Sequence, residues 1–198
     1  MHKQELAPGI YVYRDVMPSR KHNDLINFIE DAVSKEITYW SKARSLNDEV
    51  DGVYSDVRDT DTIGITYNLP YSNQNPADEF RYLMSKLFYD TFTAAENDYK
   101  SSNGCTTRTH EMYTILKYGV GQKFINHVDD HPDFPRTVST VYYINDDYTG
   151  GEIFFPKFDL LYKPKANELL VFPSTFVYMH SVNAVESGTR YAVVSWLN

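Results

Sequence analysis

The fold of this chain is decided in residues 111–129, EMYTILKYGVGQKFINHVD, where helical patterns give way to β-like ones. From there to residue 198, short runs rich in β-branched and aromatic residues alternate with turn signals such as Gly150-Gly151. Many short strands joined by Gly-rich turns are typical of a jelly-roll barrel. We therefore predict an α+β fold, mainly β: a double-stranded β-helix, or cupin-like jelly roll, with supporting N-terminal helices. The candidate strands are 111–118, 123–128, 137–144, 152–155, 168–172, 177–183 and 189–196.

The N-terminal half supplies the helices. Apolar residues at helical spacing predict one helix from about 21 to 34, with Ser19 as its N-cap. Asn75-Pro76 starts a second helix, because Asn is a good cap and Pro fits the first turn. The apolar stripe of this second helix is expected to pack on the sheet, and it consists of Phe80, Leu83, Met84, Leu87, Phe88, Thr91, Phe92 and Ala95.

Two other segments of this half are expected to be a strand and a loop. A short strand is predicted at 9–13. Residues 41–62 are polar and charged, which indicates an exposed loop that orders over a substrate. We treat 1–198 as a single domain, in which 1–109 form the helical support and the substrate loop and 110–198 form the jelly-roll core.

Composition limits the classes of protein that this chain can belong to. It has a net charge of −8 and no run of Lys or Arg, so a nucleic-acid-binding groove is not expected. Cys105 is the only cysteine, which excludes an internal disulfide and favours a reducing compartment. No apolar run approaches the length of a membrane span. We expect a soluble, cytoplasmic protein with no membrane or nucleic-acid partner, and the oligomeric state stays open.

Two histidines and one aspartate stand where neighbouring strands can bring them together. His127 and Asp129 are expected to point to the same side of one β-like run, and His180 lies in another. Two imidazoles and one carboxylate are the ligand set of non-haem Fe(II) sites, which leave three coordination positions open. His131, in the following loop, is the alternative ligand to His127. No ligand role is expected for the other histidines, which are His2, His22 and His110.

Arg190 begins the last β-like run and is expected to face the barrel interior. Charged side chains seldom turn inward without a partner, and a guanidinium can bind a carboxylate through two parallel hydrogen bonds. A chelating 2-oxo acid with a second carboxylate would satisfy Arg190. It would also fill two of the open metal positions and leave one for dioxygen.

Three motifs resemble those of a known family. The first is YGVGQKF at 118–124, which runs into His127 and Asp129. The second is RTVSTVYYIN at 136–145, followed by Gly150-Gly151-Glu152. The third comprises 164–172, HSV at 180–182, GTRY at 188–191 and Trp196. In order and spacing the chain is similar to the Fe(II)/2-oxoglutarate-dependent dioxygenases, in their prolyl 4-hydroxylase-like branch, strongly over 111–198 and weakly before that.

The resemblance implies a role for each matching residue. His127, Asp129 and His180 would bind Fe(II). Arg190 and Tyr143 would bind the distal carboxylate of 2-oxoglutarate, and Tyr118 would lie beside its iron-proximal end. Arg136 and Trp196 would border a peptide substrate. Arg58, from the 41–62 segment, is a further substrate candidate, or simply an exposed arginine among acidic residues.

Two departures from the family pattern stand out. Asn167 stands where many relatives have a glycine in a turn. The turn is expected to be kept, because Asn tolerates the left-handed backbone conformation. Phe124 replaces a tyrosine near the substrate, which removes one possible hydroxyl contact.

The resemblance further implies hydroxylation of prolyl residues in a peptide or protein, with release of succinate and carbon dioxide and support from ascorbate. The alternatives are a hydroxylase of another residue or of a free amino acid, and a non-catalytic metal- or ligand-binding barrel. A nucleic-acid demethylase fits less well, because Trp196 stands where that branch has a second arginine. The acidic composition favours substrate peptides with basic flanks.

Overall fold

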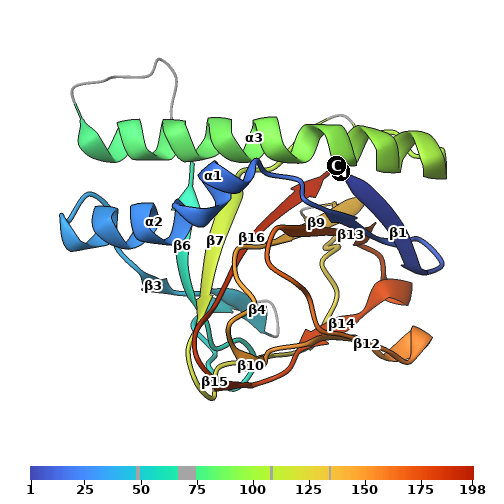
Figure 1. Ribbon diagram of the computed structural model, residues 1–198. Helices are drawn as coiled ribbons and strands as arrows, with labels where there is room; N and C mark the ends of the chain where they lie inside the picture. The colour runs from blue at the N-terminus through green and yellow to red at the C-terminus, as the bar shows by residue number, and fades with distance from the viewer. Residues whose placement is uncertain (48–49, 67–74, 108, 134) are drawn as a thin grey trace.

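Two antiparallel sheets and a long helix make up the molecule in the computed structural model, which describes residues 1–47, 50–66, 75–107, 109–133 and 135–198. Helix α3 (Pro76–Asn103) lies across the larger sheet, and the smaller sheet lies on the opposite side of that sheet (Figure 1). Within the described residues the larger sheet has eight strands. In spatial order they are β1 (His2–Ala7), β2 (Ile10–Arg14), β13 (Glu168–Pro173), β9 (Val138–Tyr143), β16 (Arg190–Leu197), β7 (Tyr113–Tyr118), β6 (Asp61–Ile65) and β3 (Ser41–Lys42).

The smaller sheet has four strands within the same described residues. In order they are β12 (Leu160–Tyr162), β11 (Ile153–Phe155), β14 (His180–Val182) and β8 (Phe124–His127). Two short pairs complete the β structure: β10 (Thr149–Gly150) with β15 (Val185–Ser187), and β4 (Ser45–Asn47) with β5 (Val50–Gly52). Single 3₁₀ turns at Pro156–Phe158 and Phe176–Tyr178 precede β12 and β14.

The central strands β9 and β16 are buried on both faces, and their side chains alternate between two separate cores. Tyr142 and Val193 join the cluster under the helices, whereas Tyr143 and Val194 join the cluster between the two sheets. The register places Tyr143 beside Ala192. The chain therefore builds a structural face and a cavity face from the same two strands.

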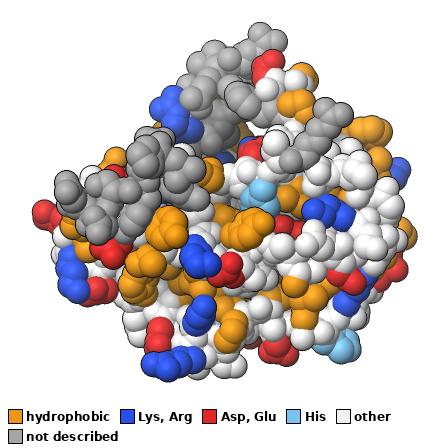
Figure 2. All heavy atoms as spheres, turned by 90° about the horizontal axis from the view of Figure 1, so that it is seen from above, with side chains coloured by type: hydrophobic (Ala, Val, Ile, Leu, Met, Phe, Trp, Pro, Cys, Tyr) orange, Lys and Arg blue, Asp and Glu red, His pale blue; other side chains and the backbone are white. Residues whose placement is uncertain are grey.

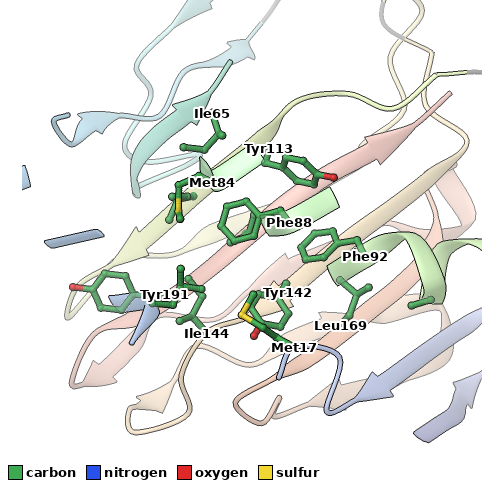
Figure 3. Packing of buried hydrophobic residues seen from close by; sticks show 14 of the residues in the cluster. Met17, Ile65, Met84, Phe88, Phe92, Tyr113, Tyr142, Ile144, Leu169 and Tyr191 are labelled. Carbon is green, nitrogen blue, oxygen red and sulfur yellow. The ribbon is translucent and has the colours of Figure 1, made fainter. Parts of the chain in front are cut away.

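Helix α3 begins and packs as its sequence predicts. The Asn75 side chain accepts a hydrogen bond from the Ala77 amide at 2.9 Å, and Pro76 occupies the first turn. Apolar side chains of α3 lie against strand residues in the close-up (Figure 3), among them Met84, Phe88 and Phe92 against Tyr113, Tyr142 and Leu169. Each such side chain contributes roughly 1.5–3 kcal/mol by burial. Leu83 departs from the predicted stripe and is 44% exposed, because it lies to one side of the buried row.

Several local predictions differ from the structure. The predicted helix at 21–34 is two helices, α1 (Ser19–Asn23) and α2 (Leu25–Ser34). Ser19 lies inside α1, and Pro18 occupies the N-cap without a side-chain hydrogen bond, so the capping prediction is wrong. The strand predicted at 9–13 is β2, which also pairs with β1.

The 41–62 segment is not the loop that its polarity suggested. It contains β3, the β4–β5 pair and the start of β6, although residues 48–49 lie outside the described residues. Polar composition hides these strands because β3, β4 and β5 are only two or three residues long, and β3 lies at the edge of the larger sheet. Asn167 does adopt the predicted left-handed conformation, with φ 63°, and its side-chain amide binds the main chain of Met17 in both directions.

The surface seen from the α3 side mixes charge types. Acidic, basic and hydrophobic side chains are interspersed there, and no basic stripe crosses the described part of this face (Figure 2). None of the described helices is both long and apolar enough to cross a bilayer.

Candidate metal and cosubstrate site

The three predicted metal ligands meet at one edge of the smaller sheet. His127 on β8 and His180 on β14 are directly paired across the two strands. Asp129 lies in a bend two residues beyond the end of β8, rather than on the strand as predicted. One ligand atom from each of the three side chains lies within 4.8 Å of the others. The described residues thus offer two imidazole nitrogens and one carboxylate oxygen to a single point.

Hydrogen bonds hold the Asp129 bend in place. The Ser139 hydroxyl on β9 donates to Asp129 Oδ2 at 2.7 Å, and the Arg136 guanidinium donates to the Asp129 carbonyl at 3.2 Å. The next amide, of Asp130, donates to the Ser174 carbonyl at 3.0 Å. These contacts orient the carboxylate, although Asp129 does not lie on a strand. Hydrogen bonds from neighbouring residues commonly orient metal ligands in this way.

Both histidines present the same ring nitrogen to the site. Nδ1 of His127 donates to the Ile125 carbonyl at 2.8 Å, and Nδ1 of His180 donates to the Tyr178 carbonyl at 3.0 Å. A carbonyl only accepts, so each Nδ1 carries the proton and each Nε2 offers a lone pair. The Nε2 atoms lie 3.8 Å from the two Asp129 oxygens.

The electrostatics also suit a cation. Burial, together with nearby His180, lowers the pKa of His127 to about 3, so this imidazole stays neutral. Burial opposes ionisation of Asp129, but the two imidazoles and Ser139 outweigh it and lower the pKa of this carboxyl. Two imidazoles beside a carboxylate fit Fe(II). His131 lines the same cavity but is not part of this ligand group, which disfavours it as the alternative ligand.

A cavity of about 570 Å³ opens from the ligand group into the space between the sheets. Besides the three ligands, its walls include the other predicted site residues Tyr118, Arg136, Trp196, Arg190 and Arg58. Tyr143 lies behind the wall, fully buried next to Arg190. The structure therefore brings every sequence-predicted site residue to one region.

Arg190 is the most unusual of these residues. It is 1% exposed, and its Nε and Nη1 atoms have no hydrogen-bond partner among the described residues. Its guanidinium lies 4.9 Å from the Tyr118 ring and 5.2 Å from the Tyr143 ring. Burying a charge without a partner is costly, so the geometry fits an anion that completes the site. A dicarboxylate such as 2-oxoglutarate would supply that anion.

Tyr148 is a site residue that sequence reasoning missed. Its hydroxyl, like that of Tyr143, is buried and without a partner among the residues described. Burial raises the pKa of both phenols, so each keeps its proton and can donate. A Cβ on Gly151, which has φ +64°, would lie 3.0 Å from both the Arg190 and Tyr148 side chains. The Gly150-Gly151 pair was the available signal, because it lets these side chains approach the backbone.

The two predicted substrate-wall residues are bound to each other. The Arg136 guanidinium lies 3.7 Å from the centre of the Trp196 ring and makes two hydrogen bonds, of 2.9 and 2.8 Å, to Glu111. Its charge is therefore already neutralised, and the pair forms a wall rather than a free cation. Sequence reasoning did not identify Glu111 as this partner.

Two other histidines have structural partners. His22 is half-buried and hydrogen-bonded to the Tyr142 hydroxyl at 2.7 Å. His110 makes an isolated bridge to Leu197 and a 3.0 Å contact with buried Glu96 on α3.

Known proteins resemble this chain in sequence and in fold. Residues 113–198 match the family model described as the 2OG-Fe(II) oxygenase superfamily. The chain is 42% identical over 53 residues to a PKHD-type hydroxylase of Crocosphaera subtropica, covering 26% of this chain and 23% of that protein. It is 33% identical over 98 residues to one of Picosynechococcus sp., covering 46% and 44%. Human prolyl 3-hydroxylase 2 is 38% identical over 66 residues, covering 31% and 9%. The matches thus span less than half of each relative.

Solved structures agree over nearly the whole chain. A Trichoplax adhaerens prolyl hydroxylase, solved with a hypoxia inducible factor peptide fragment, superimposes with a TM-score of 0.69 at 17% identity, covering 96% of this chain and 83% of that one. A Pseudomonas putida prolyl-4-hydroxylase gives 0.65 at 18% identity, covering 96% and 92%. At such identities the likeness concerns the fold, and it confirms the predicted double-stranded β-helix with supporting helices.

Proposed function

We propose that this chain, whose residues 113–198 match the family model of the 2OG-Fe(II) oxygenase superfamily, is an Fe(II)- and 2-oxoglutarate-dependent hydroxylase of prolyl residues in a peptide or protein. The names of its relatives support this choice, because prolyl hydroxylases recur among both the sequence matches and the structural neighbours. The peptide in the Trichoplax complex supports a peptide rather than a small-molecule substrate.

One observation carries the proposal: a buried arginine with unpartnered nitrogens lines the same cavity as the complete ligand group. His127, Asp129 and His180 would hold Fe(II). Bound Fe(II) with 2-oxoglutarate and dioxygen supplies hydroxylation of an unactivated C–H bond, with release of succinate and carbon dioxide. A barrel that only binds ligands would not need both an open metal face and a buried anion site.

The chain's own residues fix the position of the cosubstrate. Arg190, Tyr143 and Tyr148 bring unsatisfied polar atoms together, which would bind the distal carboxylate of 2-oxoglutarate. Tyr118 packs against Arg190 on the cavity wall and would border the cosubstrate on the metal side. Holding the cosubstrate at both ends fixes its orientation at the metal. The Arg136–Trp196 wall would then border the substrate peptide.

The test measures succinate formation with Fe(II), ascorbate, 2-oxoglutarate and proline-containing peptides, and the mass of each peptide afterwards. We expect succinate and a product 16 Da heavier in matching amounts, and neither with His180→Ala. His131→Ala is the matched control and should retain turnover. Parallel assays with free amino acids and with peptides that lack proline test the alternative substrates. No consumption of 2-oxoglutarate under any condition would contradict the proposal.

A further inference from the structure

Arginines outnumber carboxylates among the described residues that line the cavity, although the chain as a whole carries −8. Among its described lining residues are four arginines, Arg44, Arg58, Arg136 and Arg190, and one carboxylate, that of Asp129. The cavity charge therefore differs in sign from the charge of the chain. A local excess of one sign in a walled cavity selects for a ligand of the other sign.

Most of these charges already have a function in the site. Asp129 belongs to the metal ligands, and Arg190 faces the cosubstrate position. Arg136 is neutralised by Glu111, with a shortest contact of 2.8 Å. Two arginines remain, Arg44 and Arg58, and Arg58 is the one that lies beside Phe124.

Arg58 lacks a carboxylate partner among the described residues. Its Nε is buried with no hydrogen-bond partner, and Nη1 reaches only the Arg44 carbonyl, at 3.3 Å. The neighbouring Asp59 is occupied by Lys42 at 3.0 Å and by the Gln122 amide at 2.9 Å. An exposed arginine among acidic residues would have been expected to pair with one of them. Arg58 instead lines the cavity.

The position of Arg58 relative to the metal ligands is fixed by stacking. Its guanidinium lies 5.0 Å from the centre of the Phe124 ring. That ring stacks on His127 with centres 3.5 Å apart and planes 11° apart. Arg58 is thus separated from a metal ligand by a single aromatic ring.

Backbone pairing makes this arrangement rigid. The Ile125 amide donates to the Val57 carbonyl at 3.0 Å, and the Asp59 amide donates to the Lys123 carbonyl at 2.9 Å. The segment that carries Arg58 is therefore an extra edge beside β8. A cation held in this way can bind a substrate group at a set distance from the reacting carbon.

We infer that the substrate carries an acidic side chain close to the residue that is hydroxylated, and that Arg58 binds its carboxylate. The inference rests on the proposed function and names its substrate class. It reverses the preference for basic flanks that overall charge suggests. Overall charge acts over long distances and is screened by salt, whereas a contact between Arg58 and a carboxylate is screened much less.

The experiment compares three peptides of equal length that differ only in the two residues flanking a central proline: Glu, Gln or Lys. Binding to the Mn(II)- and 2-oxoglutarate-loaded protein is measured calorimetrically without oxygen, at low and high salt. We expect the Glu peptide to bind roughly fivefold more tightly than the Gln peptide, the ratio for one charge pair worth about 1 kcal/mol. The Lys peptide should bind most weakly.

Variants assign the preference to Arg58. Arg58→Gln should remove the difference between the Glu and Gln peptides, and Arg58→Lys should keep part of it. Arg20→Gln, an exposed arginine outside the cavity with the same change in charge, should keep all of it. Calorimetric binding of 2-oxoglutarate checks that each variant is folded.

Three results would overturn the inference: equal binding of the peptides, tightest binding of the Lys peptide, or a Glu preference that persists in Arg58→Gln. Binding of none of the peptides would also count against it. Each of these differs from a failure of the proposed function, which would appear as wild-type protein that neither binds nor consumes 2-oxoglutarate.

Discussion

Replacing Arg190 by methionine should make the protein more stable without cosubstrate while abolishing cosubstrate binding. Two nitrogens of the buried guanidinium have no partner among the described residues, and an unsatisfied buried polar group costs about 1–3 kcal/mol, more when it is charged. Methionine fills similar space without that cost. We expect the free energy of unfolding to rise by about 1–3 kcal/mol and Tm by roughly 2–10 °C.

The assay is thermal and urea unfolding with Mn(II), with and without 2-oxoglutarate. Wild type should gain about 2.7 kcal/mol at a cosubstrate concentration 100 times Kd, whereas Arg190→Met should gain nothing. Arg14→Met is the contrasting control. Arg14 pairs at 2.9 Å with the buried carboxylate of Glu168, so its loss should destabilise the protein. An Arg190→Met protein that is less stable than wild type without cosubstrate, or equally stabilised by it, would refute the reasoning.

Two further substitutions test the surroundings of the site, and a pH dependence tests a buried ion pair elsewhere in the fold. Ser139→Ala removes the 2.7 Å hydrogen bond to Asp129 and should weaken Mn(II) affinity roughly tenfold in a metal titration. Tyr148→Phe removes one buried hydroxyl and should weaken 2-oxoglutarate binding by roughly tenfold or more in calorimetry, as expected for a hydrogen bond to a charged group. Burial alone would lower the pKa of His110, but the effect of Glu96 is larger, and the net result is a pKa above the ordinary 6.5. This pair should therefore stabilise the fold fully below pH 6.5, and the contribution should fall as pH rises through the raised pKa.

Matched variants accompany these changes. Tyr142→Phe is the control for Tyr148→Phe. It alters a β9 residue whose hydroxyl bonds His22 and Asn167 on the helix side, and it should leave 2-oxoglutarate affinity unchanged. Unfolding of Glu96→Gln should lose the pH-dependent stabilisation that His110 confers. If Tyr142→Phe and Tyr148→Phe weaken the cosubstrate equally, or if Glu96→Gln keeps the wild-type pH profile, the corresponding assignment is wrong.

The sequence alone indicated the barrel and the ligand group because both leave local signals. We can recognise strand alternation and turn glycines without knowledge of tertiary contacts. The same holds for the order of His127, His180 and Arg190 along the chain. Even Asp129, whose strand position was wrong, lies at the site, because the bend that replaces the strand is held by Ser139 from β9. A side-chain contact from a distant strand leaves no local pattern, so the bend itself was not predictable.

Residues that act through tertiary partners were missed for the same reason. Tyr148 lies in a bend after β9, and only tertiary packing around Gly151 shows that its side chain lies near that of Arg190. Glu111 pairs with Arg136 across 25 residues of sequence. The strands that lie wholly within 41–62 are only two or three residues long, so the polar composition of this segment resembles that of a loop.

The alternation of β9 and β16 also determines how the protein could be re-engineered. Val141 and Val194 line the cavity, whereas Tyr142 and Val193 pack beneath the helices. Substitutions at sites without shared partners add nearly independently in their effects on stability. Directed evolution of selectivity can therefore vary cavity-facing positions of both strands in a combinatorial library. Stabilising changes on the opposite face of the same strands can then compensate for destabilised library members without altering the substrate that the enzyme accepts.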